Sequence, residues 1–387
     1  MRSPKQEVFK ADHTTMSEPP PLPGQQINDG KGRIFPCEQC GADLKFHIGE
    51  QSLKCPFCGA KRELSFSENA EIREQNFEEM VAELKRRKSE QEHEDPEHQE
   101  VRCESCGTDV IFDGTLTSID CPYCGSPLQR EKIHTGGFRV NVDAVMPFQI
   151  DPRQAQGKIA AWVQSLWFAP NDFKKIGAKG KCNGVYLPFW TFDTLTFTVY
   201  HGERGEDYTT TVGTGDKKRT VTRTRWYTAT GKFQRFFDDV LINATGKFSK
   251  TDLEELGPWP LDSLLPFTQE VIAGHFARTY DVELEDALPI AKQIIDAAIR
   301  SECRGRIGGD RQRVHSVKTR YDAVTYKHCL LPIYMLAYRY KGKSFRVFVN
   351  GASGTVRGER PFSWVKISAA VLSALAVVIT GLALFSR

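Results

Sequence analysis

The strongest hydrophobic pattern in the chain is an unbroken apolar run near its C-terminus. Residues 367–385 contain no charged side chain, and a helix of this length rises ~28 Å, enough to cross the hydrocarbon layer of a membrane. Apolar side chains cover every side of such a helix, which favours a membrane span over the alternative of a helix buried in a protein core. We therefore predict a single transmembrane helix over residues 365–386.

Residues 138–362 show a different pattern, in which short apolar runs are broken by proline and glycine. A proline lies near the start of three runs, where its missing N–H is tolerated, and these are predicted strands: MPFQI (146–150), LPFWTF (187–192) and LPIYMLAYRY (331–340). The last is expected to form a hairpin with SFRVFV (344–349) across a KGK turn. Helical periodicity over 151–168 and 286–303 completes the pattern of an α+β domain with a mainly antiparallel sheet.

The predicted helices carry further information. The apolar face of the 151–168 segment includes Trp167, so we expect that side chain to be packed.

Residues 65–94 lack glycine and proline, and Ser65 with Glu68 has the spacing of a capping box, which predicts a third helix. Because residues 65–100 are rich in charge, this helix is expected to be a solvated linker; a partner-binding or coiled-coil helix is the alternative.

Composition sets the broad class of the protein. The chain has 387 residues, is 40% hydrophobic and carries a net charge of +3, which is sufficient for several domains with real cores. Its 11 cysteines are an odd number, and its N-terminus is polar and proline-rich, so a secreted disulfide framework is disfavoured. Residues 1–33 are predicted to be a disordered leader.

Eight of the cysteines form four Cys-x-x-Cys pairs in two matched sets. An offset of 66 residues superposes the sets, which are Cys37, Cys40, Cys55 and Cys58, and Cys103, Cys106, Cys121 and Cys124. A glycine follows the second cysteine of every pair, where such a turn favours a positive φ. Two pairs bring four thiolates to one ion, so we predict two zinc ribbons, each holding one structural Zn²⁺. Thioredoxin-like redox chemistry and an iron site are the alternatives.

The charge of the ribbons indicates what they bind. Residues 101–132 carry more acidic than basic side chains, and a four-thiolate zinc unit adds about two negative charges to each ribbon. Nucleic-acid affinity depends mainly on cationic contacts to phosphate, so a protein partner is favoured for both ribbons. A four-thiolate site also leaves no open coordination position, which argues against catalysis by these metals.

Basic and aromatic side chains gather in two segments of the α+β domain, residues 216–237 and 304–320. The candidate anion contacts are Lys217, Lys218, Arg219, Arg223, Arg225 and Trp226. This combination suits a nucleic-acid backbone with stacked bases, and it suits anionic lipid headgroups equally well. The simpler alternative is a pair of exposed hairpins kept soluble by their charge.

Enzyme motifs are absent from the sequence. It contains no G-x-x-x-x-G-K-[ST], H-E-x-x-H or G-x-S-x-G, so an ATP-driven helicase is excluded and no enzymatic activity is expected. A hidden hydrolase would have to use His201, Asp193 and Glu203, whose simpler interpretation is as loop and strand-end residues.

Several segments resemble a bacterial family of membrane-tethered double zinc-ribbon proteins. The resemblance rests on the two ribbons, the closing apolar helix, LWFAPNDFKK (166–175), GVYLPFWTFD (184–193), YHGERG (200–205) and LLPIYMLAYRYKGKSFRVFVNGASGTVRGERP (330–361). Members are catalogued as having transcription factor IIB-type zinc ribbons, often under the name of the primosomal replication factor Y helicase, and their activity is uncharacterised. The resemblance implies a bacterial inner-membrane protein. Basic residues concentrated before the apolar run place the N-terminal bulk in the cytoplasm.

These features predict a multidomain protein. Its parts are a leader (1–33), a zinc ribbon (34–64), a charged helical linker (65–100), a second zinc ribbon (101–132), the α+β domain (138–362) and the transmembrane helix (365–386). The predicted function is that of a membrane-anchored, non-enzymatic adaptor whose ribbons bind a protein partner. The alternative is a nucleic-acid-binding protein that acts near the membrane in transcription or replication without helicase activity. The partner and the oligomeric state stay open.

Overall fold

The computed structural model describes most of the chain. The described residues are 35–42, 44–48, 50–64, 72–89, 99–102, 109–111, 118–120, 127–129, 133–135, 139–177, 182–215, 218–246, 253, 255–340 and 343–385. The predicted leader lies outside them, as do Ser65 and Glu68.

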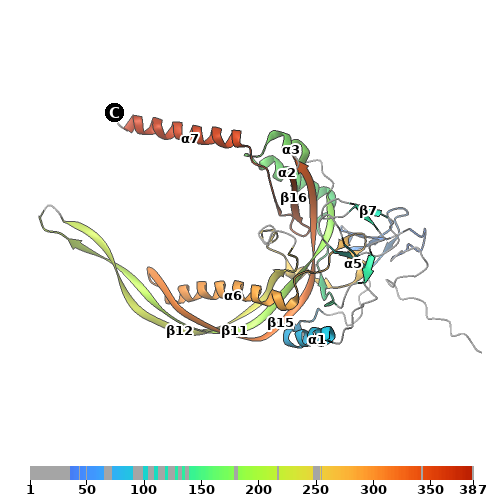
Figure 1. Ribbon diagram of the computed structural model, residues 1–387, viewed down its shortest axis with the longest axis horizontal. Helices are drawn as coiled ribbons and strands as arrows, with labels where there is room; N and C mark the ends of the chain where they lie inside the picture. The colour runs from blue at the N-terminus through green and yellow to red at the C-terminus, as the bar shows by residue number, and fades with distance from the viewer. Residues whose placement is uncertain are drawn as a thin grey trace, which may run out of the picture.

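A nine-stranded sheet forms the body of the protein (Figure 1). Its main order is β12-β11-β15-β10-β13, and β4, β14, β16 and β17 pair at its margins. The strands are β4 (Gln75–Asn76), β10 (Ala144–Val145), β11 (Asn183–Val212), β12 (Arg219–Asn243), β13 (Leu265–Pro266), β14 (Phe276–Ala277), β15 (Arg311–Tyr340), β16 (Lys343–Asn350) and β17 (Val356–Gly358). The pairings β10–β15 and β11–β14 are parallel and the other described pairings of this sheet are antiparallel. The expectation of a mainly antiparallel sheet is confirmed.

Three small sheets of the described residues precede the body. One has the order β1-β2-β3, with β1 (Lys45–His47), β2 (Ser52–Lys54) and β3 (Lys61–Arg62). Further along the chain, β5 (Gln99–Arg102) lies between β6 (Asp109–Ile111) and β9 (Ile133–Thr135), and β7 (Ser118–Asp120) pairs with β8 (Pro127–Gln129).

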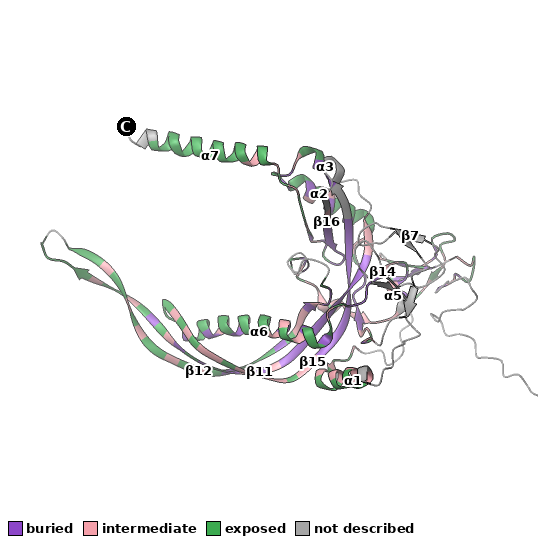
Figure 2. Cartoon of the chain, in the orientation of Figure 1, coloured by how far each residue is buried: buried purple, intermediate pink, exposed green. Residues whose placement is uncertain are grey.

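Three long strands continue past the body as a curved extension, which we call the arm (Figure 1). It comprises residues 195–212 of β11, 219–237 of β12 and 311–322 of β15, with β11 in the middle and paired with both other strands. Helix α6 (Leu284–Ile307) lies along its concave side. We call the face that α6 covers the inner face and the opposite one the outer face. Burial falls from the body toward the tip of the arm (Figure 2).

Alternation along β11 explains how α6 is held. Successive strand residues point to opposite faces, and Thr196, Thr198 and Tyr200 are buried on the inner face whereas Val199 on the outer face is exposed. From α6, side chains spaced about four apart meet this face, because that spacing gives one stripe of a helix. They are Ile295, Ile299, Cys303 and Ile307, packed with Tyr200, Phe233 and Phe237.

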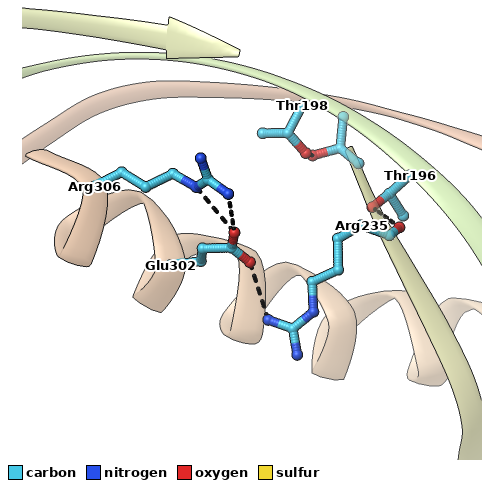
Figure 3. A network of polar contacts seen from close by, with 6 residues as sticks. Thr196, Thr198, Arg235, Glu302 and Arg306 are labelled. Atoms are coloured by element: carbon cyan, nitrogen blue, oxygen red, sulfur yellow. Dashed lines mark hydrogen bonds and ion pairs between the residues drawn. The ribbon is translucent and has the colours of Figure 1, made fainter. Parts of the chain in front are cut away.

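A polar network adds to this apolar contact (Figure 3). The Glu302 carboxylate on α6 accepts a hydrogen bond from Arg235 of β12 at 3.1 Å and another from Arg306 at 2.7 Å. Beneath them, the Thr196 hydroxyl donates to the Arg235 carbonyl at 2.8 Å and the Thr198 hydroxyl lies 3.1 Å from that of Thr319. The threonine bonds satisfy polar groups on a face that α6 removes from water, whereas Arg235 and Arg306 stay partly exposed.

Helix α2 (Pro152–Ser165) forms where helical periodicity predicted a helix. Asp151 caps it: its carboxylate accepts from the Gln154 amide at 2.8 Å and the Gln154 side chain accepts from the Asp151 amide at 2.9 Å. The helix ends at Ser165, and Trp167 is 80% exposed, so the expectation that this tryptophan packs on the apolar face is wrong. Short helices follow as α3 (Asn171–Gly177), η3 (Leu261–Ser263) and α5 (Gln269–Ile272).

The linker helix is shorter than predicted. Helix α1 covers Phe77–Ser89, whereas the preceding residues 72–76 are not helical and Gln75–Asn76 forms β4 against Thr325 and Tyr326. The Asn76 side-chain oxygen accepts from the Glu79 amide at 3.1 Å, which supplies the cap. The strand pairing and this cap start the helix later than the sequence pattern suggested.

The prolines of the sheet do not begin strands, contrary to expectation. Pro188 and Pro332 lie inside β11 and β15, and 146–150 follows β10 without forming a strand. The ladder from β11 to β12 starts at Phe189, one residue after Pro188, and that from β15 to β16 starts at Ile333, one residue after Pro332. Each proline therefore lies one residue outside the ladder on that side of its strand, where no hydrogen bond from its backbone nitrogen is needed. The strand can continue through the proline for this reason. The predicted 331–340 and 344–349 hairpin is confirmed.

Helix α7 (Trp364–Phe385) occupies the predicted apolar segment. It is the one helix among the described residues that is long and apolar enough to cross a membrane, over Trp364–Leu382, and none of that stretch is buried against the protein. Figure 1 shows it leaving the body beside α2 and α3.

The packing of α6 on the arm gives a first prediction. Ile299→Ala removes a fully buried side chain and is expected to lower the free energy of unfolding by about 2–4 kcal/mol. Ile294→Ala on the same helix changes a side chain that is 42% exposed, so its cost is expected to stay below about 1 kcal/mol. Urea unfolding of the full chain in detergent measures both, and equal losses would show that α6 does not pack on the arm in this register.

Candidate metal centre

Two matching turns carry the first set of cysteines. Cys37 and Cys40 precede β1, and Cys55 and Cys58 lie between β2 and β3. In the first turn the Gly41 amide donates to the Cys37 carbonyl at 2.7 Å, and in the second the Gly59 amide donates to the Cys55 carbonyl at 3.1 Å.

The two glycines have φ values of 70° and 77°, in the left-handed region that strains other residues. The prediction that a glycine is needed after each pair is confirmed for this set.

The four sulfur atoms converge on one point. All four Sγ atoms lie within 4.8 Å of one another, with 3.5 Å between those of Cys37 and Cys58 and 3.4 Å between those of Cys40 and Cys55. A tetrahedral ion with bonds of ~2.3 Å holds its sulfur ligands roughly 3.8 Å apart. The cluster has the size and donor set of a four-thiolate metal site.

Backbone amides lower the proton affinity of two of these thiols. Hydrogen bonding from the Cys40 backbone lowers the pKa of Cys37, and from the Cys58 backbone lowers that of Cys55 to about 6. Cys58 has a backbone hydrogen bond with Ala60 that lowers its pKa, but burial and the bonds shared with the other three thiols outweigh it and raise the pKa to about 12. The turns thus favour thiolates, the form that binds metal, and mutual repulsion opposes ionising all four without a cation.

The position of the cysteines in turns also distinguishes this site from a thioredoxin-like redox pair. A thioredoxin-like cysteine pair starts a helix, where the helix N-terminus stabilises the thiolate. Both pairs here lie in turns beside the β1-β2-β3 sheet.

The cysteine cluster shares its hydrophobic core with the body. Phe46 pairs directly with Leu53 across the β1–β2 hairpin, which gives this small module one aromatic and one aliphatic side chain in its core. Both are buried in the same apolar cluster as Phe148 and Val271 of the body. The Phe46 amide also donates to the Ala273 carbonyl at 3.2 Å. The cysteine module is therefore fixed to the body.

A salt bridge strengthens this junction. Arg62 of β3 donates to Glu270 of α5 at 3.0 Å, and the Glu270 side chain is buried. The Arg62 guanidinium lies over the Phe35 ring. Sequence reasoning missed this pair because its members are 208 residues apart and no local pattern links them.

The second set of cysteines, Cys103, Cys106, Cys121 and Cys124, lies outside the described residues. One strand pairing beside it matches the first copy: Ile119 pairs with Leu128 as Leu53 pairs with Arg62, each residue shifted by 66. The repeat seen in the sequence is therefore present in the register of this strand pair.

A separate acidic group surrounds Asp193. Glu74, Asp193 and Asp238 lie close enough to share a cation, but the Lys327 ammonium lies 2.7 Å from Asp239, 3.6 Å from Glu74 and 3.8 Å from Asp193. Burial raises the pKa of Asp193 to about 6. The lysine supplies the positive charge, so the arrangement is that of a buried ion pair.

The three residues considered for a hydrolase do not lie together. Asp193 and His201 are eight residues apart on β11, roughly 26 Å along a strand. Glu203 lies on the outer face and contacts Arg313 and His315. These three side chains therefore do not line a common pocket.

The arm separates the candidate anion contacts between its two faces. Arg219, Arg223 and Arg225 alternate along β12 and so share the inner face beyond the end of α6, with Tyr208 paired opposite Arg223. Trp226 points to the outer face, where the Arg313 guanidinium lies 3.8 Å from its ring centroid. Lys218 precedes β12, and Lys217 lies outside the described residues.

One aromatic partner of the arginines, Tyr208, was missed by sequence analysis. The Arg225 guanidinium lies 5.2 Å from the Tyr208 ring centroid, and Tyr227 follows Arg225 on the same face, with a hydrogen bond that raises the arginine pKa. Only strand pairing brings Tyr208 of β11 beside them, since the two lie on opposite sides of the hairpin turn.

Comparisons with known proteins give one distant relative. The chain is 24% identical over 327 residues to "Uncharacterized protein YdjG" of Bacillus subtilis (strain 168), covering 69% of this chain and 92% of that protein. No family model matches the chain, and no solved structure matches it.

The cysteine cluster gives a second prediction. Cys55→Ser removes one of four ligands and is expected to lower the metal content of the purified chain by one ion, because a three-thiolate site binds far more weakly. Cys182→Ser, at a free cysteine outside the cluster, is the matched control and should leave the content unchanged. Elemental analysis of first-row transition metals measures both. An unchanged content in Cys55→Ser would contradict a metal at this cluster.

Proposed function

We propose that this protein is a membrane-anchored, non-enzymatic zinc-ribbon adaptor whose ribbons bind a protein partner. The observation that carries the proposal is the closed set of four thiols, held on the body of a chain that ends in a candidate membrane span. Such a chain presents a rigid surface close to a membrane.

Zinc is the metal that the donor set favours. Four thiolates in tetrahedral arrangement suit Zn²⁺ or an iron site, and the paired hairpin turns are typical of structural zinc. All four ligands come from the protein, so the ion would stabilise the turns and leave no position for a substrate. The second ribbon is proposed to hold a second Zn²⁺ through Cys103, Cys106, Cys121 and Cys124.

An exposed aromatic residue supports protein binding by the ribbon. Phe57 lies between Cys55 and Cys58 and is 82% exposed. Aromatic side chains on rigid turns lose little entropy on binding and often dominate interfaces. The matching position in the second ribbon is Tyr123, which keeps an aromatic at the same place in the repeat.

The membrane topology follows from charge. Basic residues lie before the apolar run of α7, among them Arg346, Arg357, Arg360 and Lys366. By the positive-inside rule the N-terminal bulk is proposed to lie in the cytoplasm, at the inner membrane of a bacterium.

A second candidate function has one specific observation in its favour. Arg219, Arg223 and Arg225 share a face at the tip of the arm with Tyr208 and Tyr227, both of which are partly exposed. Cationic and aromatic groups on one surface suit single-stranded nucleic acid, and the same arginines suit anionic lipid headgroups. Nucleic-acid binding near the membrane is the alternative that this face supports.

The adaptor proposal predicts a role for Phe57. Phe57→Ala is expected to abolish the crosslinks that the wild-type chain forms through its ribbon in membranes, with metal content unchanged because no ligand is altered. Phe236→Ala removes another exposed aromatic, on the outer face of the arm, and should keep those crosslinks. Quantitative crosslinking mass spectrometry compares the three chains. Equal crosslinking of wild type and Phe57→Ala at this ribbon would contradict the proposal.

The alternative predicts salt-dependent binding by the arm. Replacing Arg219, Arg223 and Arg225 with glutamine is expected to weaken binding of a single-stranded oligonucleotide and to reduce the slope of log affinity against log salt by roughly 2 to 3. The control replaces Arg153, Arg300 and Arg304, exposed residues of α2 and α6, for the same loss of charge. Fluorescence anisotropy of the full chain in detergent provides the measurement. Equal weakening by both triple variants, or no binding at low salt, would exclude an oligonucleotide site at the tip.

A further inference from the structure

The loop between α2 and α3 exposes aromatic side chains that no other part of the described chain covers. Trp167 is 80% exposed and Phe168 is 42% exposed, although the helix before them buries Ile159 and Val163. A large aromatic side chain in water is unfavourable, so an exposed pair of this kind marks a surface that contacts something else.

This loop is bound to the start of α7. The Lys366 ammonium donates to the Ala169 carbonyl and the Asn171 side-chain oxygen, both at 2.8 Å, and to the Trp167 carbonyl at 3.3 Å. The Ser363 amide donates to the Phe168 carbonyl at 2.8 Å. The Lys366 ammonium is thereby hydrogen-bonded by neutral polar groups, and the loop is held at the level where the candidate span begins.

The start of α7 is itself aromatic. Trp364 is 78% exposed and Phe362 is 55% exposed. Tryptophan is enriched at the membrane–water interface, because its ring is apolar and its indole N–H needs a polar partner. Four aromatic side chains from two distant segments therefore lie at one end of the span.

We propose that the α2–α3 loop enters the headgroup region of the bilayer and, with Trp364 and Phe362, forms an aromatic anchor for the body at the membrane surface. This inference rests on the proposed membrane anchoring by α7. Its occupant is the lipid interface itself, since the loop is tied to the residue at which the apolar span starts.

The charges of the arm restrict how the body, held by the aromatic anchor, can be positioned at the membrane. Charged side chains occur on both of its faces, for example Arg223 on the inner face and Lys318 on the outer face, so the arm stays out of hydrocarbon. Residues 368–382 of α7 are exposed along their whole length, whereas the bonds of Ser363 and Lys366 hold its first turn. These bonds hold the loop beside Trp364 at the start of the helix.

The test uses the full chain reconstituted in vesicles of phosphatidylcholine and phosphatidylglycerol. Tryptophan emission is quenched from within the bilayer by lipids brominated near the headgroup. Trp167→Phe and Trp364→Phe each remove one emitter, and Trp226→Phe on the arm is the matched control. We expect Trp167→Phe and Trp364→Phe each to lower the lipid-quenched part of the emission by roughly half, because both indoles sit in the interface, and Trp226→Phe to leave it unchanged.

Two other outcomes are informative in different ways. A drop in Trp364→Phe without one in Trp167→Phe means that α7 inserts while the loop stays in water, which overturns the inference and keeps the anchoring. No drop in either variant means that α7 does not insert, which overturns the proposed anchoring and the inference together.

Discussion

Backbone hydrogen bonding on both sides of β11 is the interaction on which the rest of the structure depends. This strand pairs with β12 and β15 along most of its 30 residues. In the body its side chains belong to the hydrophobic clusters, and in the arm they form the face on which α6 packs. Through β15 and its hairpin with β16 and β17, the same ladder leads to α7.

The body holds the two features that suggest a function. The cysteine module shares a core with Phe148 and Val271 and is bound by the pair between Arg62 and the buried Glu270. Lys366 and Ser363 tie the first turn of α7 to the α2–α3 loop, whose Leu166 and Ala169 belong to the same core. Neither a cysteine turn nor an apolar helix has enough contacts to orient itself, so the body supplies the fixed geometry between them. A rigid connection of this kind suits a scaffold near a membrane better than a flexible tether would.

The arm shows how strand pairing sorts charge. Basic and aromatic residues that alternate along β12 are divided between two faces, so that three arginines gather with Tyr208 and Tyr227 while Trp226 stacks under Arg313. On the inner face nearer the body, the bond from Arg235 to Glu302 shows another use of arginine, which here helps to hold α6 on the strands. The same residue type therefore serves packing at one end of the arm and exposes charge at the other.

The sequence alone determined the features that depend on local spacing. The apolar run required a helix at α7, the cysteine spacing and glycines fixed the first metal turns and the Phe46–Leu53 pairing, and Asp151 with Gln154 capped α2. Only the tertiary structure decided which strands extend through Pro188 and Pro332, where α1 begins, and which face carries Trp226. It also decided that Trp167 is exposed and that Arg62 meets Glu270. The physical reason is that turns, caps and apolar periodicity act over a few residues, whereas ladder partners and the Arg62–Glu270 pair come from segments that only the fold brings together.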